Sequence, residues 1–188
     1  MKEKLWVADV LEVLKQRSQK ECDIVSPHGR LLYCAAHPDS LIIKDHNDTY
    51  YQFAASIDQI GTVRIGAYTR KPIGYQEYEC HPDLLGGPLF MFMLQHFESS
   101  SRSVKRIHDV WLGQCDQFGN YETNYDLWSQ AQKNAFGLSD EERNMQAVSN
   151  TVSAKIYFRY GFTPDMSTYH FLPEYEDDPA QISVFFYR

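Results

Sequence analysis

The sequence predicts an α/β protein of the α+β type, in which a mixed, mainly antiparallel sheet is flanked by helices. Two observations support this. The N-terminal half contains short β-prone runs separated by turn residues, a pattern typical of an antiparallel meander. The C-terminal quarter combines an amphipathic helical pattern with two further β-like runs. At 188 residues, the chain fits one domain spanning residues 1–188.

The first elements follow from hydrophobic periodicity. Apolar residues at helical spacing predict an opening helix over Trp6–Leu14. Asn47 and Asp48 suit a tight turn, because both residue types tolerate unusual backbone angles. Four short strands are expected around them, at Arg30–Cys34, Ser40–Lys44, Thr49–Ala54 and Thr62–Tyr68.

A strand, a glycine-containing loop and a helix are expected next. Tyr75–Cys80 alternates as a strand, residues 81–87 form a loop, and the apolar run Pro88–Phe97 predicts a helix. Pro88 suits the first helical position, where its missing N–H costs no internal hydrogen bond. This succession favours phosphate binding, because unpaired N–H groups and the helix dipole converge at a helix start.

The following stretch predicts a strand at Val104–Leu112 and then two helices, Asn124–Ala135 and Asp140–Val148. Ser139 and Glu142 have the spacing of a capping box at the start of the second helix. The two helices form a helical insertion around residues 121–149. An alternative, in which residues 144–149 are a strand, stays open.

The last helix is expected within Asn150–Phe162. Val152, Ile156 and Tyr160 recur at helical spacing. Asn150 is the predicted N-cap, and Gly161 is the predicted left-handed stop at the C-terminal end. Two β-like runs follow, Ser167–Leu172 and Gln181–Tyr187, which predict a hairpin or strand pair.

This end of the chain resembles the GNAT superfamily of N-acyltransferases. The last helix of that family commonly reads Asn, a small residue, Tyr, two polar residues, any residue and Gly-Phe, and two closing strands follow it. The departures are Ser153, where alanine is usual, and Phe158, where a polar residue is usual. The resemblance covers the C-terminal quarter, where these residues fall in register: Asn150, Ser153, Tyr157, Phe158, Arg159, Tyr160, Gly161 and Phe162.

The resemblance implies transfer of an acyl group, acetyl by default, from acyl-coenzyme A to an amine on a small molecule or a protein. Such a reaction needs a neutral amine, a polarised carbonyl and a protonated leaving thiolate. The resemblance implies that Tyr157 is the acid and that Glu77 or Glu79 is the base. His81 and His108 are secondary candidates for the base.

The resemblance also implies a site for acetyl-coenzyme A. Its pyrophosphate would lie on a loop containing Leu85, Gly86 and Gly87, and Asn150 and Tyr157 would line the same site. The family loop usually carries Arg or Gln, two residues, Gly, any residue, and Gly or Ala.

This chain departs from that loop pattern at two positions. Asp83 stands at the Arg/Gln position and Pro88 at the second small position, so one carboxylate is added and one N–H donor is lost. The departures motivate an alternative, an acyltransferase-like fold without catalysis that acts as a protein-interaction module or effector. A third hypothesis, a hydrolase that uses Cys34 or Cys115 with a remote histidine, has no specific support.

The amino-acid composition indicates which classes of binding partner to expect. The formal net charge of −7 disfavours nucleic acid, because phosphate binding needs a basic face. The spacing of the cysteines and histidines predicts no metal site. We expect a soluble, cytoplasmic protein without a membrane partner. The four cysteines are scattered, no apolar run is long enough to span a bilayer, and the sequence shows no secretory signal. A homodimer is left open.

Overall fold

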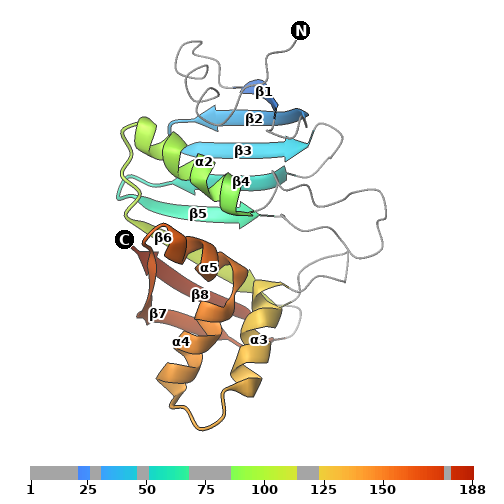
Figure 1. The fold of residues 1–188 in the computed structure, drawn as a ribbon, viewed down its shortest axis with the longest axis vertical. Coiled ribbons are helices and arrows are strands. Elements are labelled where there is room, and N and C mark those ends of the chain that lie inside the picture. The colour runs from blue at the N-terminus through green and yellow to red at the C-terminus, as the bar shows by residue number, and fades with distance from the viewer. Residues whose placement is uncertain (1–20, 26–30, 46–50, 68–85, 114–122, 176–178) are drawn as a thin grey trace. The chain divides into compact units, whose positions relative to one another are not determined.

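The computed structural model describes residues 21–25, 31–45, 51–67, 86–113, 123–175 and 179–188. These residues form an α+β protein of mostly antiparallel strands and four helices (Figure 1). The chain divides into two compact units. Described residues up to Val104 belong to the first, and Lys105–Arg188 belong to the second. The assignment of residues 1–188 to one domain stays a prediction.

The sheet of the first unit has five strands in chain order, each antiparallel to the next. The antiparallel meander is therefore confirmed, and all four predicted strands are present with ends shifted by a few residues. One strand, β1, was not predicted, although Cys22 and Ile24 alternate with polar residues. The strands are β1 (Glu21–Val25), β2 (Leu31–His37), β3 (Ser40–Asp45), β4 (Tyr51–Ile57) and β5 (Thr62–Ala67).

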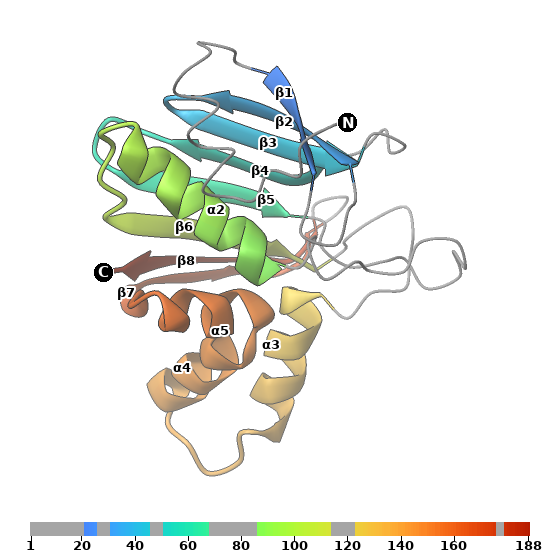
Figure 2. The same ribbon diagram turned by 45° about the horizontal axis from the view of Figure 1, so that its top comes forward.

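Helix α2 (Gly86–Ser99) lies against this sheet (Figures 1 and 2). Alternate strand residues point to one face and supply its apolar surface, because successive side chains in a strand point to opposite sides. The helix contributes Phe90, Met93 and Phe97 to the same core. The sheet contributes buried side chains that include Leu32, Cys34, Leu41, Ile43, Phe53 and Val63.

One polar side chain of α2 is buried in this core. The His96 Nε2 donates to the carbonyl oxygen of His37 at 2.6 Å. Burial lowers the pKa of His96 below its ordinary value, since a charged imidazolium loses its hydration there. The hydrogen bond connects the helix to the end of β2.

The second unit has a three-stranded antiparallel sheet. It consists of β6 (Arg106–Leu112), β7 (Thr163–Leu172) and β8 (Gln181–Tyr187), with β8 between the other two. The strand pair predicted at the C-terminus is confirmed. However, β7 begins four residues earlier than expected, at Thr163, and includes Pro164. Pairing of β7 with β8 is interrupted between Asp165 and His170.

Three helices lie to one side of this sheet, as Figure 2 shows. They are α3 (Asn124–Asn134), α4 (Asp140–Asn150) and α5 (Val152–Arg159). The capping box of Ser139 and Glu142 is confirmed, and Thr123 and Asp126 form a second one that was not predicted. Because α4 is helical through Asn150, the alternative strand over residues 144–149 is wrong.

Side-chain alternation in β8 defines the core of the second unit. Ile182, Val184 and Phe186 are fully buried, whereas the residues between them are half-buried. The Phe186 ring meets the ring of Tyr157 on α5 edge-on, with centroids 4.9 Å apart. The buried face of the sheet is therefore the face that the helices cover.

Three predicted elements lie outside the described residues. They are the helix at Trp6–Leu14, the turn at Asn47 and Asp48, and the strand at Tyr75–Cys80. In the part of the chain that the structure describes, no helix is both long and apolar enough to cross a membrane.

Candidate functional site

Helix α5, the helix of the predicted site, is capped by Thr151. The Thr151 Oγ1 accepts a hydrogen bond from the Ala154 N–H at 3.2 Å and donates to the Val148 carbonyl at 2.8 Å. The prediction of Asn150 as N-cap is wrong, because α4 continues through that residue. The Asn150 Oδ1 instead accepts from the Lys155 Nζ at 3.1 Å, on the exposed surface. One extended residue, Thr151, thus ends α4 and begins α5.

A side chain from α3 completes the start of α5. The Asn124 Oδ1 accepts from the N–H groups of Val152 at 2.9 Å and Ser153 at 3.3 Å. Its Nδ2 donates to the Ser153 Oγ at 2.6 Å. These bonds use N–H groups that a helix leaves without internal partners. The first N–H groups of α5 therefore have hydrogen-bond acceptors within the protein.

The C-terminal end of α5 matches the prediction. Gly161 has φ of 82°, a conformation that favours glycine. The Phe162 N–H donates to the Tyr157 carbonyl at 3.1 Å, and the Phe162 side chain is fully buried. The predicted stop at Gly161 is confirmed.

Tyr157 lies in the core of the second unit. Its side chain is 4% exposed, and its hydroxyl donates to the Asp109 Oδ2 on β6 at 2.9 Å. Asp109 is 5% exposed, and its Oδ1 accepts from the Val110 N–H at 3.1 Å. This pair connects α5 to β6 through a buried charge-assisted hydrogen bond.

The surroundings shift both pKa values upward. Burial raises the pKa of the Asp109 carboxyl. The hydrogen bonds that Tyr157 and other neighbours donate to it lower the pKa by a smaller amount. Burial and the negative charge of Asp109 raise the pKa of Tyr157 well above its ordinary value. The phenol therefore stays protonated, and its hydroxyl donates a hydrogen bond to Asp109. This geometry gives Tyr157 a structural role, and its assignment as the catalytic acid stays a prediction.

Asp109 was not selected from the sequence. A signal for it exists, because Ile107, Asp109 and Trp111 alternate along β6 and all three are buried. A carboxylate at an inward position of a strand needs a donor from another element. The sequence does not show that this donor is Tyr157.

The predicted phosphate loop is partly described. Gly86 and Gly87 are the first two residues of α2 and not part of a preceding loop, and Pro88 is the third helical residue and not the first. A Cβ added at Gly87 would meet no atom within 4 Å. Neither a left-handed conformation nor crowding therefore requires glycine at position 87.

The remaining candidates are distributed as follows. Glu77, Glu79, His81, Leu85 and Cys115 lie outside the described residues. Cys34 is fully buried in β2. Gly86 and Gly87 belong to the first compact unit, whereas Asn150 and Tyr157 belong to the second.

His108, a secondary candidate for the base, lies on the sheet face opposite Asp109. Its Nε2 is 2.8 Å from the Ser183 Oγ, and its ring stacks on Phe185 with centroids 4.3 Å apart. The imidazole is thus held by β8, the neighbouring strand.

Among the described residues, no group of three or more His, Cys, Asp and Glu side chains is arranged to hold a metal ion. In comparisons with known proteins, no family model, no curated protein and no solved structure matches this chain.

Proposed function

We propose that this chain binds acyl-coenzyme A and transfers the acyl group, acetyl by default, to an amine acceptor. One observation carries the proposal. Helix α5 ends at Arg159, and a turn containing Gly161 and Phe162 leads from it into the antiparallel strands β7 and β8, which is the succession that the GNAT resemblance implies. The acceptor is an amine of a small molecule or of a protein.

Cofactor binding and both proton transfers each have a candidate group. Glu77 or Glu79 takes the proton of the amine, and the first turn of α2 at Gly86 and Gly87 offers N–H groups and a helix dipole to the cofactor phosphates. Tyr157 protonates the departing sulfur. Because its hydroxyl donates to Asp109 at 2.9 Å, Tyr157 acts as the acid only in a state in which that hydrogen bond is released.

Cofactor binding is the first test. Acetyl-coenzyme A at 100 times its dissociation constant would add about 2.7 kcal/mol to the free energy of unfolding, seen as a rise in melting temperature. A Gly87→Asp variant has room for its Cβ and adds a negative charge in the first turn of α2, so it should lose this stabilisation. An unchanged melting temperature of the wild type at millimolar acetyl-coenzyme A would reject acyl transfer.

The alternative is an acyltransferase-like fold that works as a protein-interaction module without catalysis. The buried hydrogen bond between Tyr157 and Asp109 favours it, because this bond removes the predicted acid from solvent. The replacement of the family's Arg or Gln by Asp83 and of its small residue by Pro88 favours it as well. Release of free coenzyme A thiol with a panel of amines separates the two functions, since only the enzyme produces it.

A further inference from the structure

One face of the second unit's sheet carries a hydroxyl between two imidazoles. Ser183 on β8 pairs with His170 on β7. It also pairs with Val110 on β6, which lies two positions from His108. Paired residues share a face of the sheet, and so do residues two apart on one strand, so His108, Ser183 and His170 lie on the same face. The helices cover the opposite face, and solvent reaches all three side chains, which are half-buried or exposed.

His108 and Ser183 have the geometry of a base and a nucleophile. The His108 Nε2 is 2.8 Å from the Ser183 Oγ, which is within reach for proton transfer. In the tautomer that carries the proton on Nδ1, the Nε2 accepts the Ser183 O–H. A serine hydroxyl is a weak nucleophile by itself, and an adjacent base of this kind activates it.

Aromatic contacts hold the His108 ring in place. The imidazole stacks on Phe185 with an angle of 5° between the planes and centroids 4.3 Å apart. Phe185 is itself held by Arg106, whose guanidinium carbon lies 5.2 Å from its ring centroid. The Arg106 Nη1 also donates to the Tyr187 hydroxyl at 3.3 Å. These contacts restrict the base to a narrow range of orientations, as proton transfer requires.

His170 stands on the other side of the serine. Because β8 lies between β6 and β7, Ser183 lies between His108 and His170. Directly paired residues have Cβ atoms about 4.5 to 5.5 Å apart. The exposed His170 imidazole can therefore donate an N–H to an oxygen bound at the carbon that Ser183 attacks. Such donors stabilise the negative charge that develops in acyl transfer.

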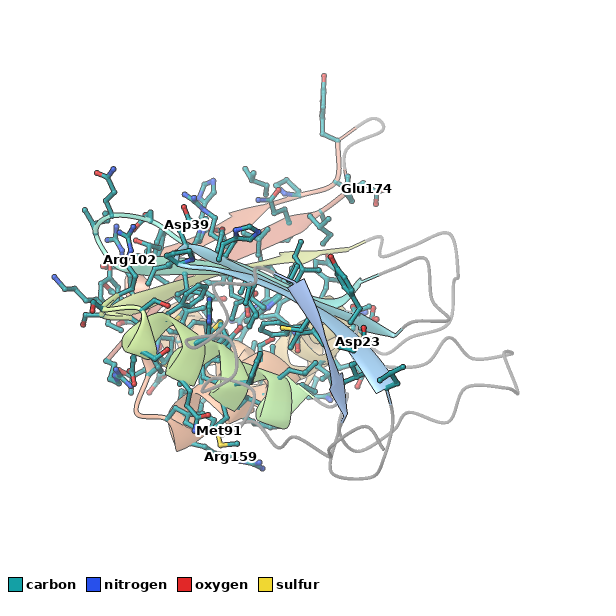
Figure 3. All side chains as sticks on the ribbon, turned by 90° about the horizontal axis from the view of Figure 1, so that it is seen from above. Asp23, Asp39, Met91, Arg102, Arg159 and Glu174 are labelled. Atoms are coloured by element: carbon teal, nitrogen blue, oxygen red, sulfur yellow. The ribbon has the colours of Figure 1, made fainter. Side chains whose placement is uncertain are left out.

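Apolar side chains occupy the adjoining part of the same face. Val110 and Leu112 on β6 are each 38% exposed, and Leu172 on β7 is 45% exposed. Leu112 and Leu172 flank Gln181, to which both are paired. In Figure 3, the labelled Glu174 marks where the chain leaves β7 at this end of the face. The surface next to Ser183 therefore suits a short apolar acyl chain.

We propose that Ser183 is the nucleophile of a second site, which hydrolyses carboxylic esters, with His108 as its base and His170 as the donor to the oxyanion. The Ser183 Oγ bonds to the ester carbonyl carbon while its proton passes to the His108 Nε2. The bond between that carbon and the alcohol oxygen then breaks, and the alcohol leaves with the proton.

Water completes the reaction. It attacks the acyl-serine, gives its proton to His108, and releases the carboxylic acid and the restored Ser183 hydroxyl. The net change is one ester and one water converted to one acid and one alcohol. The site stands on β6, β7 and β8 and is independent of the proposed acyl transfer from coenzyme A.

A fluorophosphonate probe tests the nucleophile directly. An activated serine oxygen displaces the fluoride and keeps the phosphonyl group, so peptide mass spectrometry of the full chain should find the adduct on Ser183. Ser167 is the internal control, because it is an exposed serine on β7 whose Oγ donates to the Asp165 Oδ1 at 2.6 Å. A wild type without the adduct on Ser183, or with equal labelling of Ser183 and Ser167, would overturn the proposal.

Hydrolysis of p-nitrophenyl butyrate tests the roles of the three residues. Ser183→Ala and His108→Phe should each lower the rate by at least about 100-fold. His108→Phe keeps an aromatic ring against Phe185 but accepts no proton. Ser167→Ala should hydrolyse the ester as the wild type does. A wild-type rate in Ser183→Ala or His108→Phe would overturn the site.

His170→Ala tests the oxyanion donor separately. This exposed residue can be replaced with little effect on folding, and the rate should fall by about 100-fold. Urea denaturation of each variant shows that it is folded when assayed. An unchanged rate in His170→Ala would overturn the role of His170.

Discussion

Tyr157 on α5 and Asp109 on β6 are joined by a 2.9 Å hydrogen bond inside the core of the second unit, with the phenol hydroxyl as donor. Both side chains are buried, so water cannot replace either partner. Leaving a buried carboxylate without its donor costs more folding free energy than the hydrogen bond contributes when both partners are present. The pair therefore helps to fix the position of α5 on the sheet. It also means that the Tyr157 hydroxyl is already engaged in a hydrogen bond in this structure.

Replacing Tyr157 by Phe should destabilise the protein whether or not it is an enzyme. The variant leaves the Asp109 carboxyl without the hydroxyl donor, and we expect the free energy of unfolding to fall by about 1 to 3 kcal/mol. Urea denaturation measures this loss. Tyr160→Phe, at a half-buried position near the end of the same helix, is the control and should cost less. Equal losses in both variants would show that the bond to Asp109 contributes no special stability.

Asp109→Asn should change the pH dependence of stability. The raised pKa of Asp109 means that the folded state holds this proton more tightly than the unfolded state. Its contribution to stability is therefore greatest in acid, declines as pH rises above 3.8, and levels off above the folded-state pKa. The Asn variant still accepts from Tyr157 but does not titrate.

We therefore expect the free energy of unfolding of Asp109→Asn to increase relative to that of the wild type as pH rises from 4 to 7. Chemical denaturation across this range gives the difference. A constant difference would indicate that Asp109 has an unshifted pKa in the folded state.

His96 should produce a pH dependence of the opposite sign. Burial lowers its pKa in the folded state, so the unfolded state binds the proton first as pH falls below 6.5. The contribution of His96 to stability is complete above 6.5 and declines as pH falls toward the lowered pKa. His96→Gln retains a donor for the His37 carbonyl and should lose this decline. Parallel pH profiles of variant and wild type would contradict the prediction.

Two asparagines at the ends of α3 and α4 distinguish the observed cap of α5 from the predicted one. Asn124→Ala removes the acceptor for two N–H groups of α5 and should cost about 1 to 2 kcal/mol. Asn150→Ala removes an exposed contact with Lys155 and should change stability by less than about 0.5 kcal/mol. Thermal and urea denaturation of both variants measure these costs. The reverse order would restore Asn150 as the capping residue.

Local patterns account for the elements that were predicted correctly. Short β-prone runs separated by turn residues identified four strands of the first sheet, and the spacing of Ser139 and Glu142 identified the start of α4. Gly161 identified the end of α5, because few other residues adopt its positive φ. The strand β1 was missed because its apolar pattern is only two residues long.

The candidate site was predicted less well because its contacts join distant parts of the chain. Tyr157 was selected from the sequence as the catalytic acid, which stays a prediction, and its hydrogen-bond partner Asp109 lies 48 positions earlier. Likewise, the amide acceptor for α5 is Asn124, 28 positions before Val152, and not the adjacent Asn150. Spacing along the chain carries no information on such pairs.

The sequence by itself determined most of the helices and strands of the described residues and the stop at Gly161, since side-chain alternation, capping and glycine conformations act over a few residues. It did not determine β1 or the early start of β7. Only the tertiary structure decided that the hydroxyl of Tyr157 donates to Asp109 and that α3 caps α5. The physical reason is that a buried polar group must find its partner on whichever element packs against it.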